Sequence, residues 1–326
     1  MRGPVAGETV RFYSLLQKQK SFLDEILEGF SRARKQIPAK FFYDALGCGL
    51  FDAICELPEY YLTRVETAMM REYAAEMAQC LGPDCLLIEY GSGASRKTRL
   101  LLDHLRPPAY MPIDIAGEQL RASAQALAGA YPGMQVLAVC ADYSQAIKLP
   151  VRDATGIKRK AIYFPGSTIG NFTVEETVAF LQQARGVTGR GGAMLVGVDL
   201  KKSKEVLHAA YNDAQGVTAK FNLNLLTRIN RELGADFNLS NFRHHAFYNE
   251  QAGRIEMHLE SLVAQQVKIG DRRFDFRAGE TIHTENSYKY SVAEFQDLAR
   301  KAGFAPQRSW TDAQQLFAVH YLHAGG

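Results

Sequence analysis

The sequence has 326 residues, of which 47% are hydrophobic and 22% are charged, a balance that excludes a disordered chain and allows one large core or two smaller ones. Its 38 basic and 35 acidic residues are spread along the chain, which disfavours nucleic acid as a partner. The five cysteines lack metal-ligand spacing, and the sequence has neither an export signal nor the roughly 20 consecutive apolar residues that span a bilayer, so we expect a reduced, cytoplasmic protein.

The N-terminal region carries apolar residues at helical spacing, first at Phe12 and Leu15 and then at Phe22 and Ile26. This spacing predicts two short amphipathic helices ahead of the core. Residues 38–63 follow, rich in aromatic side chains and interrupted by glycine and proline. Because this composition is unusual for a surface connection, we expect the segment to line a pocket.

The middle of the chain alternates short apolar runs with helical stretches. In chain order these segments are CLLIEY (85–90), TRLLLDHL (98–105), AYMPIDI (109–115), EQLRASAQALAGAY (118–131), QVLAVCAD (135–142), AIYFPG (161–166), EETVAFLQQAR (175–185) and AMLVGVDL (193–200). The alternation predicts βαβ units in an α/β domain with a mostly parallel, doubly wound sheet.

The pattern changes after residue 200. A helical stretch over 204–234 leads into strands over 242–269 with a turn around Gly253, which indicates a smaller inserted α+β unit. A helix at 292–304 and an apolar strand at 315–324 then complete the first sheet. The predicted first domain comprises the N-terminal helices (1–37) with residues 62–200 and 288–326, and the second comprises residues 38–61 and 201–287.

The segment LLIEYGSGASRKT places Glu89, Gly91 and Gly93 where the first strand of the sheet turns into a helix. The glycines allow the backbone to pass close to a bulky ligand. A dinucleotide-binding loop would have a third glycine where Arg96 stands, which disfavours NAD or FAD. Glu-x-Gly-x-Gly instead resembles the first motif of Rossmann-like methyltransferases, whose glycines accommodate the methionine part of S-adenosylmethionine (AdoMet).

Two aspartates follow the next strands of the predicted sheet. Asp114 stands at the end of the second strand, where a carboxylate can accept both ribose hydroxyl protons. Asp142 follows the third strand, where the resemblance implies a contact with the adenine amino group. Aspartate after a strand also commonly caps the next helix, which is the alternative for each residue alone. Their joint occurrence favours an AdoMet site.

Longer stretches resemble the histidine-specific methyltransferases of ergothioneine biosynthesis. They are FFYDALGCGLFDAICELPEYYLTRVE (41–66), IEYGSGASRKTRLLL (88–102), GSTIGNF (166–172), INRELGADFNL (229–239), RIEMHL (254–259) and HTENSYKY (283–290). The combination of LPEYY-x-TR-x-E with GSGxSxKTR is much more specific than a glycine loop alone.

This resemblance implies a Rossmann-like methyltransferase domain with an inserted substrate-binding domain. It further implies AdoMet-dependent trimethylation of the α-amine of L-histidine to trimethylhistidine (hercynine), with release of S-adenosylhomocysteine, as the first step of ergothioneine biosynthesis. We expect a monomer that uses no metal and takes a small amino acid. An N-methyltransferase for another amino acid or an indolic amine, and a catalytically silent AdoMet-binding protein, are the alternatives.

The resemblance implies cofactor contacts for Gly91, Lys97, Asp114, Asp142 and Tyr143. Lys97 would lie close to the AdoMet carboxylate. A solvated position on the helix surface is the alternative for this lysine.

Substrate contacts are implied for both ends of the amino acid. Asn171, in the GSTIGN segment that begins at Gly166, and Tyr211 match residues that hold the substrate carboxylate, for which an amide and a phenol are suitable donors. Glu285 and Ser287 match the pair that binds the imidazole, in which a carboxylate accepts one ring N–H and a hydroxyl serves the other nitrogen. The alternatives are a turn residue for Asn171 and a packing role for Tyr211. For Glu285 and Ser287 the alternative is an exposed strand with alternating polar side chains.

Tyr43 and Tyr60 match aromatic residues at the amino end of the substrate, where we predict a catalytic role because they can hydrogen-bond the amine and stabilise its positive charge. Met257 matches an apolar residue of the substrate pocket, with core packing as the alternative. The chain departs from the family pattern at Ser167, where GGTIGN has glycine, and at the polar Asn286. Both departures bear on the volume and polarity of the pocket.

Overall fold

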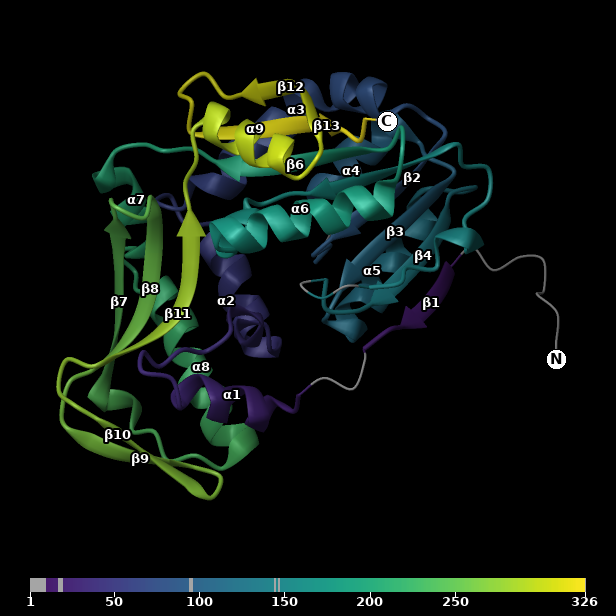
Figure 1. The fold of residues 1–326 in the computed structure, drawn as a ribbon. Helices are drawn as coiled ribbons and strands as arrows, with labels where there is room; N and C mark the ends of the chain where they lie inside the picture. Colours follow the sequence, from purple (N-terminus) through teal and green to yellow (C-terminus); the bar gives the residue numbers. More distant parts are fainter. Residues whose placement is uncertain (1–9, 17–19, 94–95, 144, 146, 326) are drawn as a thin grey trace, which may run out of the picture.

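The computed structural model describes residues 10–16, 20–93, 96–143, 145 and 147–325. An eight-stranded sheet forms its centre (Figure 1). Its strands, in spatial order, are β1 (Val10–Ser14), β4 (Gln135–Cys140), β3 (Ala109–Asp114), β2 (Cys85–Tyr90), β5 (Arg159–Phe164), β6 (Ala193–Asp199), β13 (Phe317–His323) and β12 (Ala305–Thr311). Neighbours from β1 to β6 are parallel, whereas β13 runs antiparallel to both β6 and β12.

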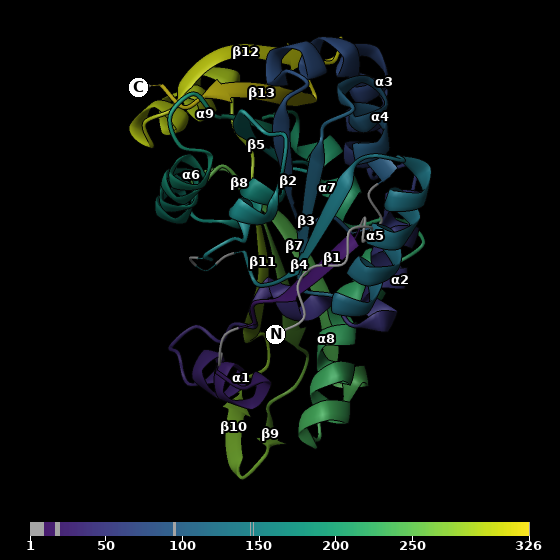
Figure 2. The same ribbon diagram turned by 90° about the vertical axis from the view of Figure 1, so that its right-hand side faces the viewer.

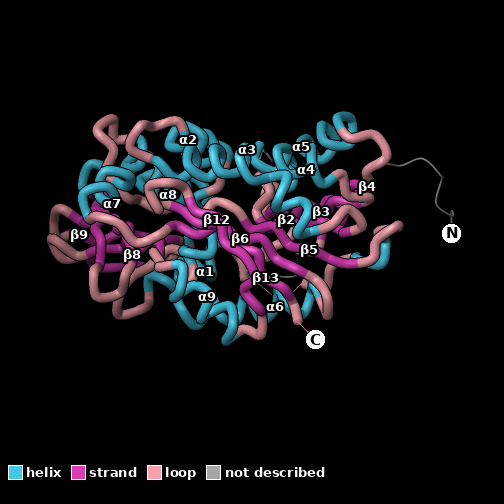
Figure 3. Tube along the Cα trace, turned by 90° about the horizontal axis from the view of Figure 1, so that it is seen from above, coloured by secondary structure: helices cyan, strands magenta, loops and turns pink. Residues whose placement is uncertain are grey.

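Helices cover both faces of this sheet (Figures 2 and 3). One face carries α3 (Tyr61–Leu81), α4 (Arg96–Leu105) and α5 (Gly117–Ala130), and the other carries α6 (Val174–Thr188) and α9 (Val292–Lys301). Each face has its own cluster of buried apolar side chains, and β2 and β6 are buried along their whole length. The predicted mostly parallel, doubly wound α/β sheet is confirmed.

A smaller α+β unit is inserted between β6 and α9 (Figure 1). It comprises α7 (Lys204–Tyr211), α8 (Val217–Leu233), a three-stranded antiparallel sheet in the order β11 (Thr281–Tyr288), β8 (Arg254–Ser261), β7 (Phe242–Asn249), and the hairpin of β9 (Gln265–Ile269) with β10 (Arg272–Phe276). The predicted turn between β7 and β8 is confirmed, with Gly253 at a φ of +66°. The insertion predicted from the change of pattern after residue 200 is therefore present.

Three short helices that precede α3 in the chain share the core of this inserted unit: α1 (Phe22–Phe30), η1 (Ala39–Phe42) and α2 (Ala45–Cys55). Phe30 of α1, for example, packs edge-on against Phe274 of β10 with ring centroids 5.5 Å apart. The segment predicted to line a pocket, 38–63, thus packs with the inserted unit, and its residues Lys40, Phe41 and Tyr43 line a cavity. The exact division into two domains stays a prediction.

The first of the two predicted N-terminal helices is wrong. Val10–Ser14 forms the strand β1, which pairs in parallel with β4 at the edge of the large sheet. Phe12 and Leu15 at helical spacing are too few to distinguish a helix from a strand. The backbone groups at the edge of β4 favour pairing with a strand made of β-branched and aromatic residues. The second predicted helix is confirmed as α1.

The C-terminal prediction of a helix and a strand that complete the sheet is confirmed by α9 and β13, while β12 was not predicted. All five cysteines are free thiols. Among the residues that the structure describes, no helix combines the length and apolar character needed to cross a membrane.

Candidate functional site

The loop after β2 is shaped by two glycines in the left-handed region, Gly91 with a φ of +67° and Gly93 with a φ of +46°. A Cβ on Gly91 would lie 3.3 Å from the hydroxyl of Tyr143, whereas a Cβ on Gly93 would meet no heavy atom of the described residues within 4 Å. The loop therefore passes tightly beside Tyr143 and leaves open space at Gly93. This cradle fits the methionine part of AdoMet. The expectation for Arg96 concerns its side chain, which lies outside the described part of the chain.

Asp114 closes the other side of this loop. Its Oδ2 accepts the Gly93 N–H at 2.9 Å and its Oδ1 accepts the Ala116 N–H at 2.9 Å. The N-cap residue of α5 is Ala116, and it makes no side-chain cap hydrogen bond, so Asp114 does not serve as a helix cap. Two backbone donors hold its carboxylate at the carboxyl end of the sheet, where ligands of doubly wound folds bind.

Asp142 lies just after β4 and faces a lysine from the segment before α2. Lys40 Nζ is 3.4 Å from Asp142 Oδ2 and 2.9 Å from Glu25 Oε2 on α1. Lys40 and Glu25 line a cavity of about 220 Å³, which is also bounded by Tyr43 and by Ala116, the N-cap residue of α5. The smaller unit thus reaches over the strand ends that carry the predicted adenine and ribose contacts.

Lys97 is ion-paired with Glu66, a residue of α3 that the sequence analysis did not assign to the site. The Glu66 side chain is 1% exposed and also accepts the Gly166 N–H at 2.9 Å and 3.0 Å. Lys97 is therefore not a solvated helix residue, and it is joined through one carboxylate to the GSTIGN segment. Glu66 is the last residue of the LPEYY-x-TR-x-E motif, and this motif could have identified it as a site residue.

The GSTIGN segment folds as η3 (Thr168–Asn171), which packs against β11. A Cβ on Gly170 would lie 2.9 Å from the carbonyl oxygen of Tyr288, so only glycine allows this approach. Ser167 has a φ of +57°, a conformation that glycine adopts more readily, and its hydroxyl accepts the Asp199 N–H at 2.8 Å. Asn171 Nδ2 then lies 3.5 Å from Glu285 Oε2.

Ser287 receives two hydrogen bonds in the buried interior of the site. The Tyr211 hydroxyl donates to Ser287 Oγ at 2.8 Å, and Lys289 Nζ donates to the same oxygen at 2.7 Å. Lys289 Nζ also lies 3.2 Å from the Tyr211 hydroxyl and 2.7 Å from Asp199 Oδ2. The structure thus brings together Tyr211 and Ser287, which the resemblance assigns to opposite ends of the substrate.

Asp199, at the end of β6, is ion-paired with two lysines, Lys289 and Lys202. It is fully buried and accepts from Lys202 at 2.5 Å and from the Tyr61 hydroxyl at 2.8 Å, in addition to Lys289. Burial lowers the pKa of Lys202 to about 8 despite the nearby carboxylate. Burial also opposes the charge of Lys289, but Asp199 reverses this and holds the pKa of Lys289 above its usual value.

The sequence analysis did not assign Asp199 or Lys289 to the site. Lys289, directly after β11, continues the two-residue alternation of Glu285 and Ser287, and Asp199 ends a buried strand as Asp114 does. Both signals were present in the sequence. What the sequence did not contain was the pairing that places the two charges together.

Burial raises the pKa of Glu285 to about 7, with the charge of Lys289 acting in the opposite direction. Burial likewise raises the pKa of Glu89 to about 7, although the hydroxyls of Tyr110 and Thr98 donate to its carboxylate. Glu89 therefore braces the start of α4 from inside the core, while Glu285 sits among the predicted substrate contacts.

The remaining predicted substrate residues line up beside Glu285. The rings of Tyr43 and Tyr60 both pack against Phe51, with ring centroids 5.8 Å and 6.4 Å from it, and the Tyr60 ring centroid is 6.3 Å from that of Tyr211. Desolvation raises the pKa of both Tyr43 and Tyr60 well above the usual value. Met257 of β8 is opposite Glu285 in the strand register and is 2% exposed.

Asn286, the polar departure from the family pattern, pairs its Oδ1 with Nε2 of His283 at 2.9 Å. His283, His258 and Glu256 offer possible metal-ligand atoms within 4.8 Å of one another. Arg254 is ion-paired with Glu256 at 2.7 Å in this cluster, which places a competing cation there. Because side chains alternate along β11, Asn286 lies on the opposite face of the strand from Glu285. The expectation that the enzyme uses no metal stays a prediction.

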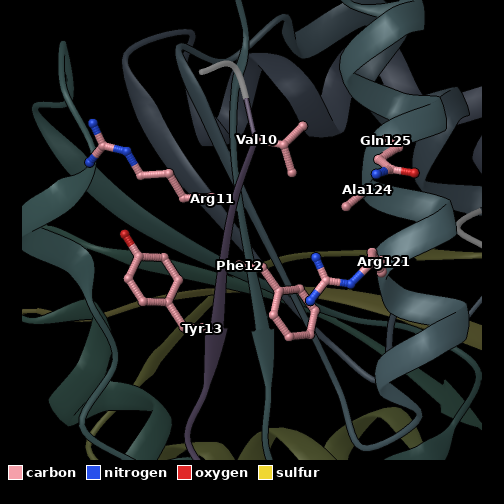
Figure 4. A pocket seen from close by; sticks show the side chains of 7 residues that line it. All are labelled: Val10, Arg11, Phe12, Tyr13, Arg121, Ala124 and Gln125. Atoms are coloured by element: carbon pink, nitrogen blue, oxygen red, sulfur yellow. The ribbon is translucent and has the colours of Figure 1, made fainter. Parts of the chain in front are cut away.

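A second cavity, of about 460 Å³, lies between β1 and α5 (Figure 4). The guanidinium of Arg121 stacks over the Phe12 ring there at 4.0 Å. None of the predicted site residues lines this cavity.

Comparison of the chain with known proteins identifies its family. The model of the SAM-dependent histidine-specific methyltransferases matches residues 22–324. The chain is 40% identical to the histidine N-alpha-methyltransferases of Mycolicibacterium smegmatis and Mycobacterium tuberculosis, over 90% of this chain and 92% of each relative. It is 30% identical to ergothioneine biosynthesis protein 1 of Neurospora crassa, over 88% of this chain and 33% of that protein. The chain therefore belongs to the SAM-dependent histidine-specific methyltransferase family.

Proposed function

We propose that this protein transfers three methyl groups from AdoMet to the α-amine of L-histidine and forms trimethylhistidine in the first step of ergothioneine biosynthesis. It acts as a monomer in the cytoplasm and needs no metal. The observation that carries the proposal is the 3.5 Å contact between Asn171 and Glu285, because it joins a donor suited to a carboxylate to an acceptor suited to an imidazole N–H. The names of its two bacterial relatives support histidine as the substrate.

On the cofactor side, Gly91 and Gly93 leave room for the methionine part of AdoMet, and Lys97 lies near its carboxylate. Asp114 accepts hydrogen bonds from the ribose hydroxyls. Asp142 accepts a hydrogen bond from the adenine amino group, beside Tyr143. When bound, AdoMet supplies a methyl group already activated on a sulfonium centre. The protein has only to align the amine with that group and to exclude water.

On the substrate side, Asn171 and Tyr211 hold the carboxylate near the backbone of Gly166, while Glu285 and Ser287 hold the ring and Met257 bounds the pocket. The amine then faces Tyr43 and Tyr60. Because their pKa values are raised, both phenols stay protonated, so they orient the amine and stabilise its growing charge rather than remove its proton.

Repeated transfer is favoured by the neutral character of these tyrosine walls. A carboxylate beside the amine would bind the ammonium tightly and hold back its proton. Neutral aromatic rings stabilise the mono-, di- and trimethylated forms alike. The quaternary amine has no lone pair, so the reaction ends at trimethylhistidine.

The test is mass spectrometry of the purified protein incubated with AdoMet and a pool of the proteinogenic amino acids. We expect successive gains of three methyl groups on histidine alone. Methylation of a different amino acid would retain the reaction and overturn the substrate. Failure to form S-adenosylhomocysteine with any amino acid would overturn the function itself.

A further inference from the structure

The three-stranded sheet of the inserted unit (Figure 1) carries three histidines in one row across its strands. His258 of β8 is opposite His245 of β7 on one side and opposite His283 of β11 on the other. Glu256 stands two residues before His258, so its side chain lies on the same face. Glu256, His258 and His283 each offer one ligand atom, and these atoms all lie within 4.8 Å of one another. These three residues form a histidine–glutamate cluster.

The histidine–glutamate cluster lies on the opposite face of the sheet from the proposed substrate contacts. Met257 and Glu285 are opposite each other in the register, whereas His283 is opposite His258. The register shifts between His283 and Glu285, and Thr284 in this bulge donates to the carbonyl oxygen of Met257 at 3.0 Å. Because side chains alternate along β8, Met257 points away from the cluster. The cluster is therefore no part of the proposed methyl-transfer site.

Glu256 presents only one of its carboxylate oxygens to the cluster. Its Oε1 accepts from Arg254 Nη2 at 2.7 Å, from Arg254 Nε at 2.9 Å and from Asn249 Nδ2 at 2.9 Å. Its Oε2 instead faces His258 Nε2 at 3.1 Å. Burial opposes the charge of Glu256, but the hydrogen bond from Arg254 reverses this and holds the pKa of Glu256 at about 2. Arg254 thus keeps the carboxylate ionised, and it competes for Oε1 while Oε2 faces the histidines.

His258 has a lone pair for which the described residues offer no donor. Its Nδ1 is buried and has no hydrogen-bond partner among them, and its Nε2 faces a carboxylate, which is itself an acceptor. Burial lowers the pKa of His258 to about 4, so the ring is neutral and carries one proton. With the proton on Nε2, the lone pair of Nδ1 is unpaired. With the proton on Nδ1, the lone pair of Nε2 meets the carboxylate. A metal cation would accept this lone pair in either tautomer.

His283 is a second neutral imidazole on the same face. Burial lowers the pKa of His283, and Asn286 Oδ1 lies 2.9 Å from its Nε2. A carbonyl partner of this kind orients the ring of a metal-binding histidine. The Glu256 and His258 side chains are 11% and 12% exposed, so an ion can enter from solvent and is then mostly surrounded by protein.

We infer that Glu256, His258 and His283 bind one divalent transition-metal ion, with Zn²⁺ as the representative, and that this ion ties β8 to β11. Two imidazoles with one carboxylate suit Zn²⁺, whereas Ca²⁺ and Mg²⁺ prefer oxygen ligands alone. The ion supplies no step of the methyl transfer. It stabilises the inserted unit, because the three ligands come together only when the two strands are paired.

The experiment titrates the chelator-treated protein with Zn²⁺ by calorimetry and repeats the titration on three variants. One ion should bind to the wild type. His258→Gln and His283→Gln should each weaken binding by about 100-fold or more, since the loss of even an outer partner of a ligand costs about 10–100-fold. His245→Gln is the matched control and should bind as the wild type does, because His245 is in the same row but not in the cluster.

Thermal unfolding is the second readout. Zn²⁺ at about a hundredfold excess over its Kd should raise the Tm of the wild type by about 4 °C. The rise should vanish in His283→Gln and persist in His245→Gln. AdoMet affinity is the control for folding and should be unchanged in all three variants. Should His258→Gln fail this control, His283→Gln decides the result.

Three outcomes would overturn the site. Zn²⁺ binding of equal strength in the wild type and in the two cluster variants would identify an adventitious ion only, held for example by the free cysteines. A wild type that binds no Zn²⁺, or an equal loss of affinity in His245→Gln, would also refute the assignment. Histidine methylation is measured separately by mass spectrometry of the chelator-treated protein, so the proposed function stands or falls independently.

Discussion

The carboxylate of Glu66 joins the side chain of Lys97 to the backbone N–H of Gly166. It thereby couples the start of α4, where the predicted cofactor contacts lie, to the segment that carries Asn171. The Lys97 side chain is 21% exposed, so water only partly screens its ion pair with Glu66. One side chain on α3 holds the two halves of the site in register.

We predict that Glu66→Gln weakens AdoMet binding by about tenfold, because the amide keeps the size of the side chain but loses the ion pair with Lys97. Calorimetry with AdoMet measures the change. Glu76→Gln on the same helix is the matched control, since its ion pair with Arg308 is solvent-exposed and should contribute little. Equal effects of the two substitutions would contradict the role of Glu66.

Glu285→Ala should weaken histidine binding by about tenfold or more and leave AdoMet affinity nearly unchanged, because only the contact with the ring is removed. Both dissociation constants can be measured on the same preparation. Equal loss of affinity for the two ligands would refute the assignment of Glu285.

Histidine affinity should fall as the pH is lowered through 7. The pKa of Glu285 is raised to about 7, and the ionised form is the one that accepts the ring N–H. At pH 6 about nine-tenths of this carboxyl is protonated, which predicts roughly tenfold weaker binding than at pH 8. Part of the decline comes from protonation of free histidine, so Glu285→Gln measures that part alone. An identical pH profile in the two proteins would rule out Glu285 as the titrating group.

The raised pKa of Glu285 also predicts that its carboxylate destabilises the folded protein at high pH. A carboxyl whose pKa rises on folding stabilises the folded protein at low pH, and this contribution is lost as the pH rises from 4.5 to about 7. Glu285→Gln should therefore raise the Tm of the ligand-free protein at pH 8, where the wild type buries a charge, and should change it little at pH 4. A lower Tm at pH 8 would show that the carboxylate is stabilising.

Asp114→Ala should weaken AdoMet binding, because it removes both the proposed ribose contact and the hydrogen bond that holds Gly93. Asp114→Asn keeps one acceptor oxygen for the loop and should lose less affinity. Asp84→Asn, whose ion pair with Lys158 is exposed, is the control. Unchanged cofactor affinity in Asp114→Ala would show that the ribose role is misplaced.

The strands and crossover helices of the large sheet were predictable because they obey local rules. Fully buried runs such as Cys85–Tyr90, each followed by an amphipathic helix, leave few alternatives. Val10–Ser14 was misassigned because its structure is decided by the free edge of β4, a partner far away in the sequence. β12 was missed because a strand with exposed polar residues at a sheet edge has little hydrophobic signal.

The same distinction applies to the site. Asp114 and Asp142 could be predicted as neighbouring site residues because they stand at or just after the ends of two adjacent parallel strands, which meet at one edge of the sheet. Lys289 and Asp199 could not be paired from sequence, because their contact depends on how the inserted unit is placed against β6. Sequence reasoning predicted candidate ligand-binding residues and missed the buried ion pair of Lys289 with Asp199.

The position of β13 between β6 and β12 also constrains how the protein is made on the ribosome. β6 is synthesised before the whole inserted unit, yet its antiparallel neighbour is among the last described segments to emerge. Until then β6 presents an unpaired backbone edge, which is open to pairing with other nascent chains. We therefore expect shortened chains that lack Phe317–His323 to aggregate, even though they contain every residue proposed to bind cofactor or substrate.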